Sequence, residues 1–149
     1  MKLGLRSGFI AAVSMLTVMA LAPAALAANP HIVGNPSDTV SGNSLILSAS
    51  VAGLGNVETV DLGLEGTVNV SSRCYTKSGN QPQAANKQET INVSQFETFP
   101  VRNGRTNATF TVTPLSTLSC PRGQRVVIES VSYNLDLVYQ GDVLHTFSG

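Results

Sequence analysis

The sequence lacks tryptophan altogether and contains few charged residues, which make up 12% of its 149 positions. Carbohydrate-binding β-sandwiches often present flat aromatic platforms to sugars, so the absence of Trp argues against a site of that kind. Lysine is scarce as well, and only Lys77 and Lys87 occur after residue 27. From residue 28 onwards there are 7 basic and 9 acidic residues, so the net charge is 7 − 9 = −2. Nucleic acids and anionic membranes favour clustered Lys and Arg, and this composition argues against both as partners.

Catalytic and metal-binding motifs are also missing. The two histidines are His31 and His145, and the sequence contains no Cys-x-x-Cys pair, no Gly-rich phosphate loop and no Gly-x-Ser-x-Gly elbow. We therefore predict no cofactor, no metal site, no catalytic residue and a protein that is not an enzyme. The alternative is a small secreted hydrolase in which Asp142 and His145 act with an unidentified serine.

The N-terminus has the three parts of a secretory signal peptide. Lys2 and Arg6 precede an apolar run over residues 9–21, and small residues follow at Ala25 and Ala27. The run is shorter than the roughly 20 residues that cross a bilayer. We expect residues 1–27 to be removed and the mature chain to be extracellular or in the cell envelope, without a membrane span.

After the signal, residues 28–43 are rich in Pro, Gly, Asn and Ser and show no sustained periodicity. This composition predicts a flexible N-terminal arm. The remaining residues, 44–149, are enough for a single domain with its own core.

Cys74 and Cys120 are the only cysteines. In an oxidising compartment, two cysteines in one exported chain predict one intramolecular disulfide. The two positions are 46 residues apart, and closing a loop of that length stabilises a fold by about 4 kcal/mol in the chain-entropy model.

Apolar residues recur with a period of two along most of the domain, which is typical of strands that bury one face. The longest such pattern runs over residues 60–74, where Gly63 and Gly66 predict a bend or bulge. In the last long pattern the phase slips near Glu129 and Ser130, which predicts a bulge there or a strand that changes sheets. About seven strands and no helical spacing favour an antiparallel β-sandwich of immunoglobulin-like topology, with a small barrel as the alternative.

Two segments are candidates for binding. Residues 76–88 form the longest polar stretch and predict a loop, and Asn103-Gly104 predicts the turn of a β-hairpin. Loops at the ends of a sandwich can vary without disturbing the core. The candidate binding residues, which lie in or next to these two segments, are Tyr75, Lys77, Asn80, Gln81, Asn103 and Arg105.

Other charged residues allow further hypotheses. Four arginines that flank turns could converge on an anionic ligand such as a cell-wall phosphate or a sugar acid, although dispersion over the surface is the simpler interpretation. These are Arg102, Arg105, Arg122 and Arg125. Glu58, Asp61 and Glu65 could suggest a glycosidase or a calcium site, but their spacing along one strand favours a solvated face. Asn69, Asn92 and Asn107 each begin an Asn-x-Ser/Thr sequence, the acceptor pattern for N-linked glycosylation, and we expect these asparagines to be unmodified.

A resemblance covers most of the chain. It rests on Gly53-Leu54-Gly55-Asn56, the alternating strand to Cys74, Thr98-Phe99-Pro100, Asn103-Gly104-Arg105 and Cys120-Pro121. In these motifs the sequence resembles a group of small secreted bacterial proteins, chiefly actinobacterial, of uncharacterised function. The resemblance implies an exported β-sandwich with two cysteines. We therefore expect a structural or binding module whose partner is a cell-wall glycan or another extracellular protein. A third possibility is assembly of identical chains through exposed strand edges, which few lysines protect.

Overall fold

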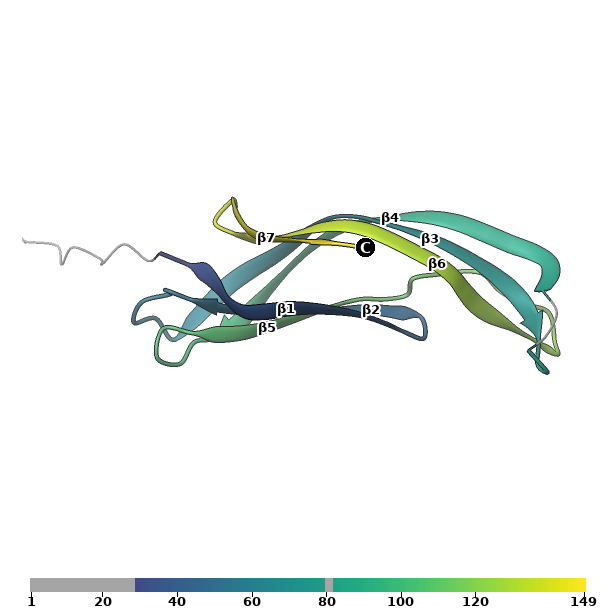
Figure 1. Cartoon of the computed structure of the whole chain (residues 1–149), viewed down its shortest axis with the longest axis horizontal. Coiled ribbons are helices and arrows are strands. Elements are labelled where there is room, and N and C mark those ends of the chain that lie inside the picture. The colour runs from purple at the N-terminus through teal and green to yellow at the C-terminus, as the bar shows by residue number, and fades with distance from the viewer. Residues whose placement is uncertain (1–28, 80–81) are drawn as a thin grey trace, which may run out of the picture.

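The computed structural model describes residues 29–79 and 82–149, which form an all-β sandwich (Figure 1). The predicted signal peptide, residues 1–27, and the candidate residues Asn80 and Gln81 lie outside the described residues. Within the described part, no helix has the length and apolar character needed to span a membrane.

Seven strands make up two antiparallel sheets, as the sequence predicts. The strands are β1 (His31–Ser41), β2 (Ser44–Ala52), β3 (Thr59–Thr76), β4 (Pro82–Pro100), β5 (Thr106–Val112), β6 (Gln124–Tyr139) and β7 (Asp142–Ser148). One sheet has the order β1-β2-β5, and the other has the order β4-β3-β6-β7. The long strand β3 is therefore paired on both sides.

The core lies between the two sheets and is built from alternate residues of β2, β3, β5 and β6. Its largest fully buried side chains are Leu45, Leu47, Leu62, Leu64, Phe110, Leu115, Leu135 and Leu137. Burying one such side chain stabilises a fold by about 1.5–3 kcal/mol. The period-two pattern seen in the sequence is thus the pattern of core-facing positions.

The four-stranded sheet is longer than the sheet it packs on. In Figure 1, three of its strands continue past the turn between β1 and β2 and curve down beyond the end of the shorter sheet. We call this part the distal arm: residues 71–76 of β3, 82–88 of β4 and 124–130 of β6, which pair side by side. The arm ends in two turns, and the other end of the sandwich holds the first described residue, Asn29.

The prediction of a flexible arm over residues 28–43 is wrong for residues 31–41, which form β1. This strand pairs with β2 from His31 and Ala52 to Ser41 and Ser44. Its Asp38 also accepts a hydrogen bond from the hydroxyl of Tyr133 in the opposite sheet. β1 is an edge strand with a mostly exposed surface, so backbone bonds rather than an apolar face hold it, and periodicity could not indicate it.

The predicted loop over residues 76–88 is also wrong in extent. β4 already begins at Pro82, and Asn86 to Gln88 pair with Arg73 to Ser71 of β3. Residues 85–88 are all exposed. A strand with solvent on both faces needs no alternating apolar residues, so its polar composition is that of a loop.

The two predicted irregularities in the long sheet have different outcomes. The bulge at Glu129 is confirmed, because Ser71 pairs with Ser130 while Ser72 pairs with Ile128. No register shift occurs at Gly63 or Gly66, so the bulge predicted there is wrong. These glycines instead permit close approach: a Cβ at Gly63 would lie 2.6 Å from side-chain atoms of Phe96 and Val138, and one at Gly66 would overlap the Asn134 carbonyl.

The turn at Asn103-Gly104 is present, with positive φ angles of 52° and 71°, and a single bridge between Arg102 and Arg105 closes it. The predicted hairpin between the flanking strands is wrong, because β4 and β5 do not pair with each other. The strands on either side of it belong to different sheets, since β4 lies in the longer sheet and β5 in the shorter one. The turn therefore carries the chain across the sandwich rather than closing one ladder.

The disulfide between Cys74 and Cys120 is present and closes a separation of 46 residues. We predict that Cys74→Ser, Cys120→Ser and the double variant each lower the free energy of unfolding of the oxidised protein by about 4 kcal/mol, because all three remove the same cross-link. Denaturant unfolding followed by circular dichroism would measure this. Losses that add in the double variant would contradict a shared bridge.

Candidate functional site

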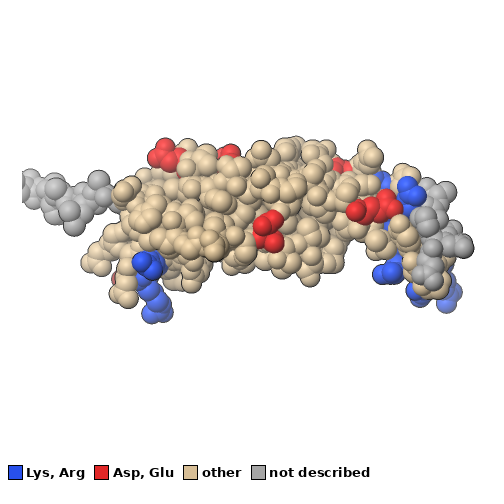
Figure 2. Space-filling view, in the orientation of Figure 1, with Lys and Arg blue, Asp and Glu red and all other residues tan. Residues whose placement is uncertain are grey.

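Charge is distributed unevenly along the molecule. Five of the seven basic residues after residue 27 lie on or between the strands of the distal arm, namely Arg73, Lys77, Lys87, Arg122 and Arg125. Only two acidic residues, Glu89 and Glu129, lie near them, whereas the other seven acidic residues lie elsewhere on the sandwich. Figure 2 shows Lys and Arg at the two ends of this face and none across its middle. The distal end is therefore locally basic, although residues 28–149 together carry a net charge of −2.

The end of the arm consists of two short turns held against each other. The backbone N–H of Lys77 donates to the Gly123 carbonyl at 3.2 Å, which joins the turn after β3 to the turn before β6. Each turn also closes on itself, through Gly79 N–H to the Thr76 carbonyl at 2.8 Å and Gln124 N–H to the Pro121 carbonyl at 3.0 Å. The loops that present the basic side chains are thus fixed by backbone hydrogen bonds.

Three basic side chains at this end form what we call the basic tip: Lys77, Arg122 and Arg125. Among the described residues none of the three makes an ion pair. The Arg125 guanidinium lies against the turn, since a Cβ on Gly79 would be 3.2 Å from its terminal nitrogen. Exposed and unneutralised guanidinium and ammonium groups on a fixed backbone can bind phosphate or carboxylate groups.

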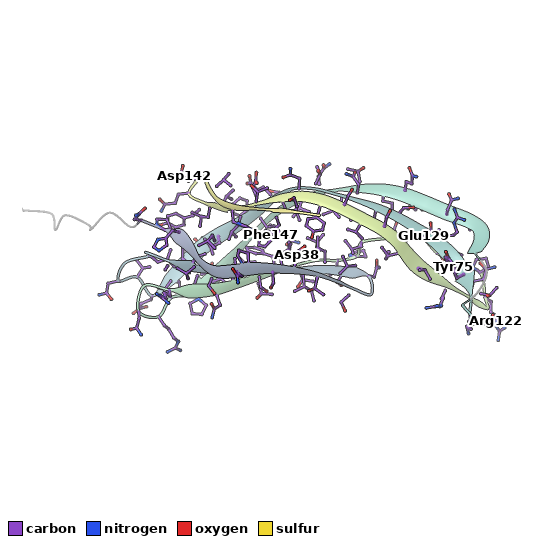
Figure 3. All side chains as sticks on the ribbon, viewed as in Figure 1. Asp38, Tyr75, Arg122, Glu129, Asp142 and Phe147 are labelled. Atoms are coloured by element: carbon purple, nitrogen blue, oxygen red, sulfur yellow. A yellow bond between two sulfur atoms is a disulfide. The ribbon has the colours of Figure 1, made fainter. Side chains whose placement is uncertain are left out.

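Tyr75 lies on the outer face of the arm beside the tip, directed away from the core as the sequence predicts (Figure 3). Its hydroxyl donates to Glu129 at 2.9 Å, and the same carboxylate oxygen is 3.5 Å from Nε of Arg73. The hydrogen bond to Glu129 raises the pKa of Tyr75 above its ordinary value of 10.0. The Glu129 bulge thus places one acidic group where it pairs with Arg73 and orients the tyrosine.

A second cluster fastens the chain between β5 and β6 to the arm, and Glu89 is its centre. The Glu89 carboxylate accepts from the backbone N–H and the hydroxyl of Thr117, at 2.9 Å and 2.6 Å, and from the Ser116 hydroxyl at 2.9 Å. It also pairs with Lys87 at 3.1 Å. The Thr117 hydroxyl is the largest cause of a pKa for Glu89 of about 2, below the ordinary 4.5.

The Glu89 cluster continues into the interior. Ser116 and Ser72, both buried, share a hydrogen bond of 2.6 Å. Together with the disulfide four residues further on, these bonds hold residues 115–120 beneath the arm. The chain then emerges at Arg122 in a defined place.

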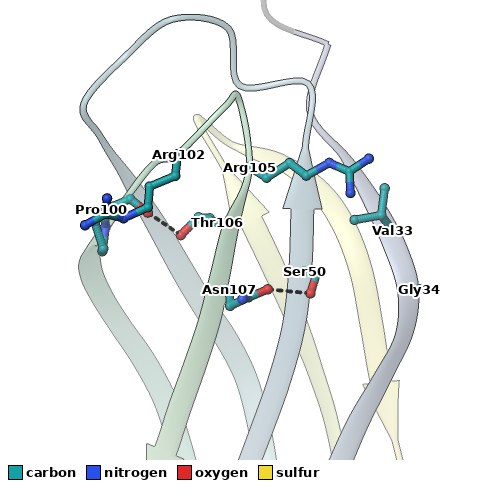
Figure 4. A pocket seen from close by; sticks show the side chains of 8 residues that line it. All are labelled: Val33, Gly34, Ser50, Pro100, Arg102, Arg105, Thr106 and Asn107. Carbon is teal, nitrogen blue, oxygen red and sulfur yellow. Dashed lines mark hydrogen bonds between the residues drawn. The ribbon is translucent and has the colours of Figure 1, made fainter.

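The opposite end of the sandwich carries the other two arginines, in the turn at Asn103-Gly104. Arg102 and Arg105 line a shallow depression of about 620 Å³ together with Val33, Gly34, Ser50, Pro100, Thr106 and Asn107. Figure 4 shows their side chains splayed apart, with Arg105 directed towards Val33 and Arg102 on the side of Pro100. The two guanidinium groups do not converge on one point in this depression.

The predicted binding residues are therefore separated. Tyr75 and Lys77 lie at the distal end, whereas Asn103 and Arg105 lie at the other, and the full length of β3 runs between them. At about 3.3 Å per residue this is roughly 50 Å. The hypothesis that Arg102, Arg105, Arg122 and Arg125 converge is wrong, because the fold divides them into two pairs.

No sequence motif marks Glu89, the residue that holds the segment before the basic tip. The sequence does contain one indication. Glu89 alternates with Ile91 and Val93, so its carboxylate lies on the same inward face of β4 as these apolar side chains. Its partners Ser116 and Thr117 are 27 and 28 residues away in the chain. No local pattern connects them.

The residues of the hydrolase alternative are not joined in the described part of the chain. Both Asp142 and His145 lie on β7, and no hydrogen bond links them there. The His145 ring packs edge-to-face on Phe147 at 4.7 Å. On β3, Asp61 accepts a hydrogen bond from Thr98. The described residues contain no group of three or more His, Cys, Asp or Glu that could hold a metal ion.

The chain was compared with protein-family models and with curated proteins, and none of them matches it. The resemblance to small secreted bacterial proteins stays a prediction.

The low pKa of Glu89 predicts acid sensitivity. Its pKa is about 2 in the folded protein and about 4.5 when unfolded, so ionised Glu89 stabilises the fold above pH 4.5, and this stabilisation is lost as the pH falls towards 2. We predict that Glu89→Gln lowers the free energy of unfolding at pH 7 by roughly 1–3 kcal/mol and flattens its dependence on pH between 5 and 2.

Denaturant unfolding from pH 7 to pH 2.5 would measure this effect. Glu65→Gln is the matched control, because Glu65 is exposed on β3 and makes no ion pair among the described residues. An unchanged acid slope in Glu89→Gln would contradict the role given to the cluster.

Proposed function

We propose that this protein is an exported, non-enzymatic recognition module that binds an anionic polymer of the cell surface through the basic tip. The polymer would carry phosphate or uronic acid groups, as some cell-wall glycans do. The observation that supports this most directly is the concentration of three basic residues, Lys77, Arg122 and Arg125, at one end of the molecule. Among the described residues they make no ion pair, and residues 28–149 as a whole carry a net charge of −2. A polymer with repeated anionic groups can contact several cationic side chains at once, and these contacts together raise its affinity.

The construction of the arm supports the same function. The disulfide at Cys74, the Glu89 cluster and the backbone bond from Lys77 to Gly123 all hold the turns at the end of the arm. Fixing a binding loop in advance lowers the entropy cost of association. Many restraints around a small exposed end favour recognition over a purely structural role.

We also propose that the domain is immunoglobulin-like and that the protein is exported from the cytoplasm. The strand orders β1-β2-β5 and β4-β3-β6-β7 support an immunoglobulin-like relationship, since such domains place their first, second and fifth strands in one sheet. The predicted signal peptide and the disulfide support export from the cytoplasm. Bacterial origin is proposed on the resemblance alone.

The two pairs of arginines provide a controlled test. We predict that the double variant Arg122→Gln/Arg125→Gln weakens binding to polygalacturonate or inorganic polyphosphate at least tenfold, because it removes two cations from one site. Arg102→Gln/Arg105→Gln changes the net charge equally at the other end and should bind within twofold of the unaltered protein. Titration calorimetry at two salt concentrations, with dextran as the neutral polymer, would measure both.

Equal losses in the two double variants would mean that binding depends on net charge rather than on the tip. Saturable binding of dextran, or no binding of either polyanion at low salt, would contradict an anionic polymer as the partner.

A further inference from the structure

Strand β4 forms one edge of the longer sheet and has a partner on one side only. It pairs with β3 without a register shift from Pro100 opposite Thr59 to Asn86 opposite Arg73. Natural edge strands are commonly protected by bulges, prolines or lysines that prevent pairing with another chain. Residues 86–98 contain no proline, and their one lysine, Lys87, is engaged with Glu89 and Thr117.

The direction of the free backbone groups of this edge follows from one hydrogen bond. Val101 N–H donates to the Glu58 carbonyl at 2.8 Å, which continues the β3–β4 register by one pair. Backbone groups alternate sides along a strand, so odd-numbered residues of β4 face β3 and even-numbered residues face outward. The outward residues are Asn86, Gln88, Thr90, Asn92, Ser94, Phe96 and Thr98.

The side chains at these outward positions suit a partner strand. None of them is charged. Phe96 is 64% exposed and covers Gly63 on the outer face of the sheet. An edge of this length can accept another extended strand by backbone hydrogen bonding. The charged residues of the edge, Lys87, Glu89 and Glu97, stand at the alternate positions and restrict the register of that pairing.

If the partner is a second copy, symmetry restricts the register. In a two-fold symmetric antiparallel pair, residues whose backbone groups face outward must hydrogen-bond to the same class of residue in the other copy. Because all of these residues are even-numbered, the two-fold axis lies level with a residue and not between two residues. Pro100 has no N–H to donate and terminates the edge on one side, and Asn86 is the last residue before the β3–β4 register shifts on the other. If the whole edge from Asn86 to Thr98 pairs with its symmetry copy, the two-fold axis lies at the midpoint of this edge, Asn92.

The charges of β4 select the same register. With the axis at Asn92, Lys87 of one copy lies directly opposite Glu97 of the other, and this pairing occurs twice. Both belong to the non-hydrogen-bonded class of pair, in which side chains are closest. Glu97 is exposed and makes no ion pair among the described residues, and the Lys87 side chain is 43% exposed. Moving the axis by one residue to Val93 would instead set Glu89 against Glu97.

We propose that two copies of this chain associate through their β4 edges, antiparallel about Asn92, to form one continuous eight-stranded sheet. The length of the free edge and the Lys87–Glu97 complementarity lead independently to this register. Because the strands are antiparallel, the two distal arms point in opposite directions. If the proposed function also holds, the dimer carries two basic tips facing away from each other and can link two polymer chains.

Analytical ultracentrifugation of the chain from Asn29 onwards, which contains every strand of both sheets, would test this. We expect a monomer–dimer equilibrium. Glu97→Lys should raise the dissociation constant at least tenfold, because it places lysine opposite lysine twice. Asn92→Pro removes an N–H that faces away from β3, so it should abolish the dimer while the monomer keeps its β3–β4 bonds.

Glu65→Lys is the control for charge, since Glu65 is exposed on the inner strand β3 of the same sheet. It should leave the dissociation constant within twofold, as should Arg122→Gln/Arg125→Gln, which separates dimerisation from polymer binding. Thermal unfolding would verify that each variant is folded. A monomer at all concentrations, or a dimer that persists in both Asn92→Pro and Glu97→Lys, would overturn the proposal.

Discussion

The double-sided pairing of β3 is the constraint on which the rest of the structure depends. Strand β3 is bonded to β4 on one side and to β6 on the other from Gly63 to Arg73, and only this pairing lets the sheet extend beyond the three strands packed beneath it. Beyond that cover, apolar burial is limited: Cys74 and Ser72 are buried, but Val126 is 37% exposed. Backbone hydrogen bonds must therefore hold the distal arm, with help from local cross-links.

Those cross-links lie on the inward face of the arm. The disulfide at Cys74 and the hydrogen bonds of Glu89 both tie the segment over residues 113–121 to the underside of the longer sheet. They differ in chemistry, because a disulfide responds to redox conditions and a carboxylate cluster to acid. Both cross-links therefore hold best under oxidising conditions near neutral pH.

The arrangement also separates two kinds of surface. The basic tip occupies the end of the arm, where backbone turns are fixed and side chains are free, whereas the β4 edge runs along the flank and offers backbone groups. The tip suits an anionic polymer, which is recognised through charge, and the edge suits an extended strand, which is recognised through hydrogen bonds. Because the surfaces do not overlap, occupying one leaves the other accessible.

The sequence by itself determined the features that depend on local periodicity or on unique residues: the core-facing positions of β3, the bulge at Glu129, the turn at Asn103 and the pairing of the only two cysteines. Each follows from alternation, from a left-handed turn preference or from the absence of another partner. β1 and residues 85–88 of β4 could not be recognised, because their side chains are mostly exposed and give no alternation of buried and exposed residues. Only the tertiary structure separated Arg105 from Arg125 and brought Glu89 to Thr117, since contacts between distant segments depend on how the two sheets pack.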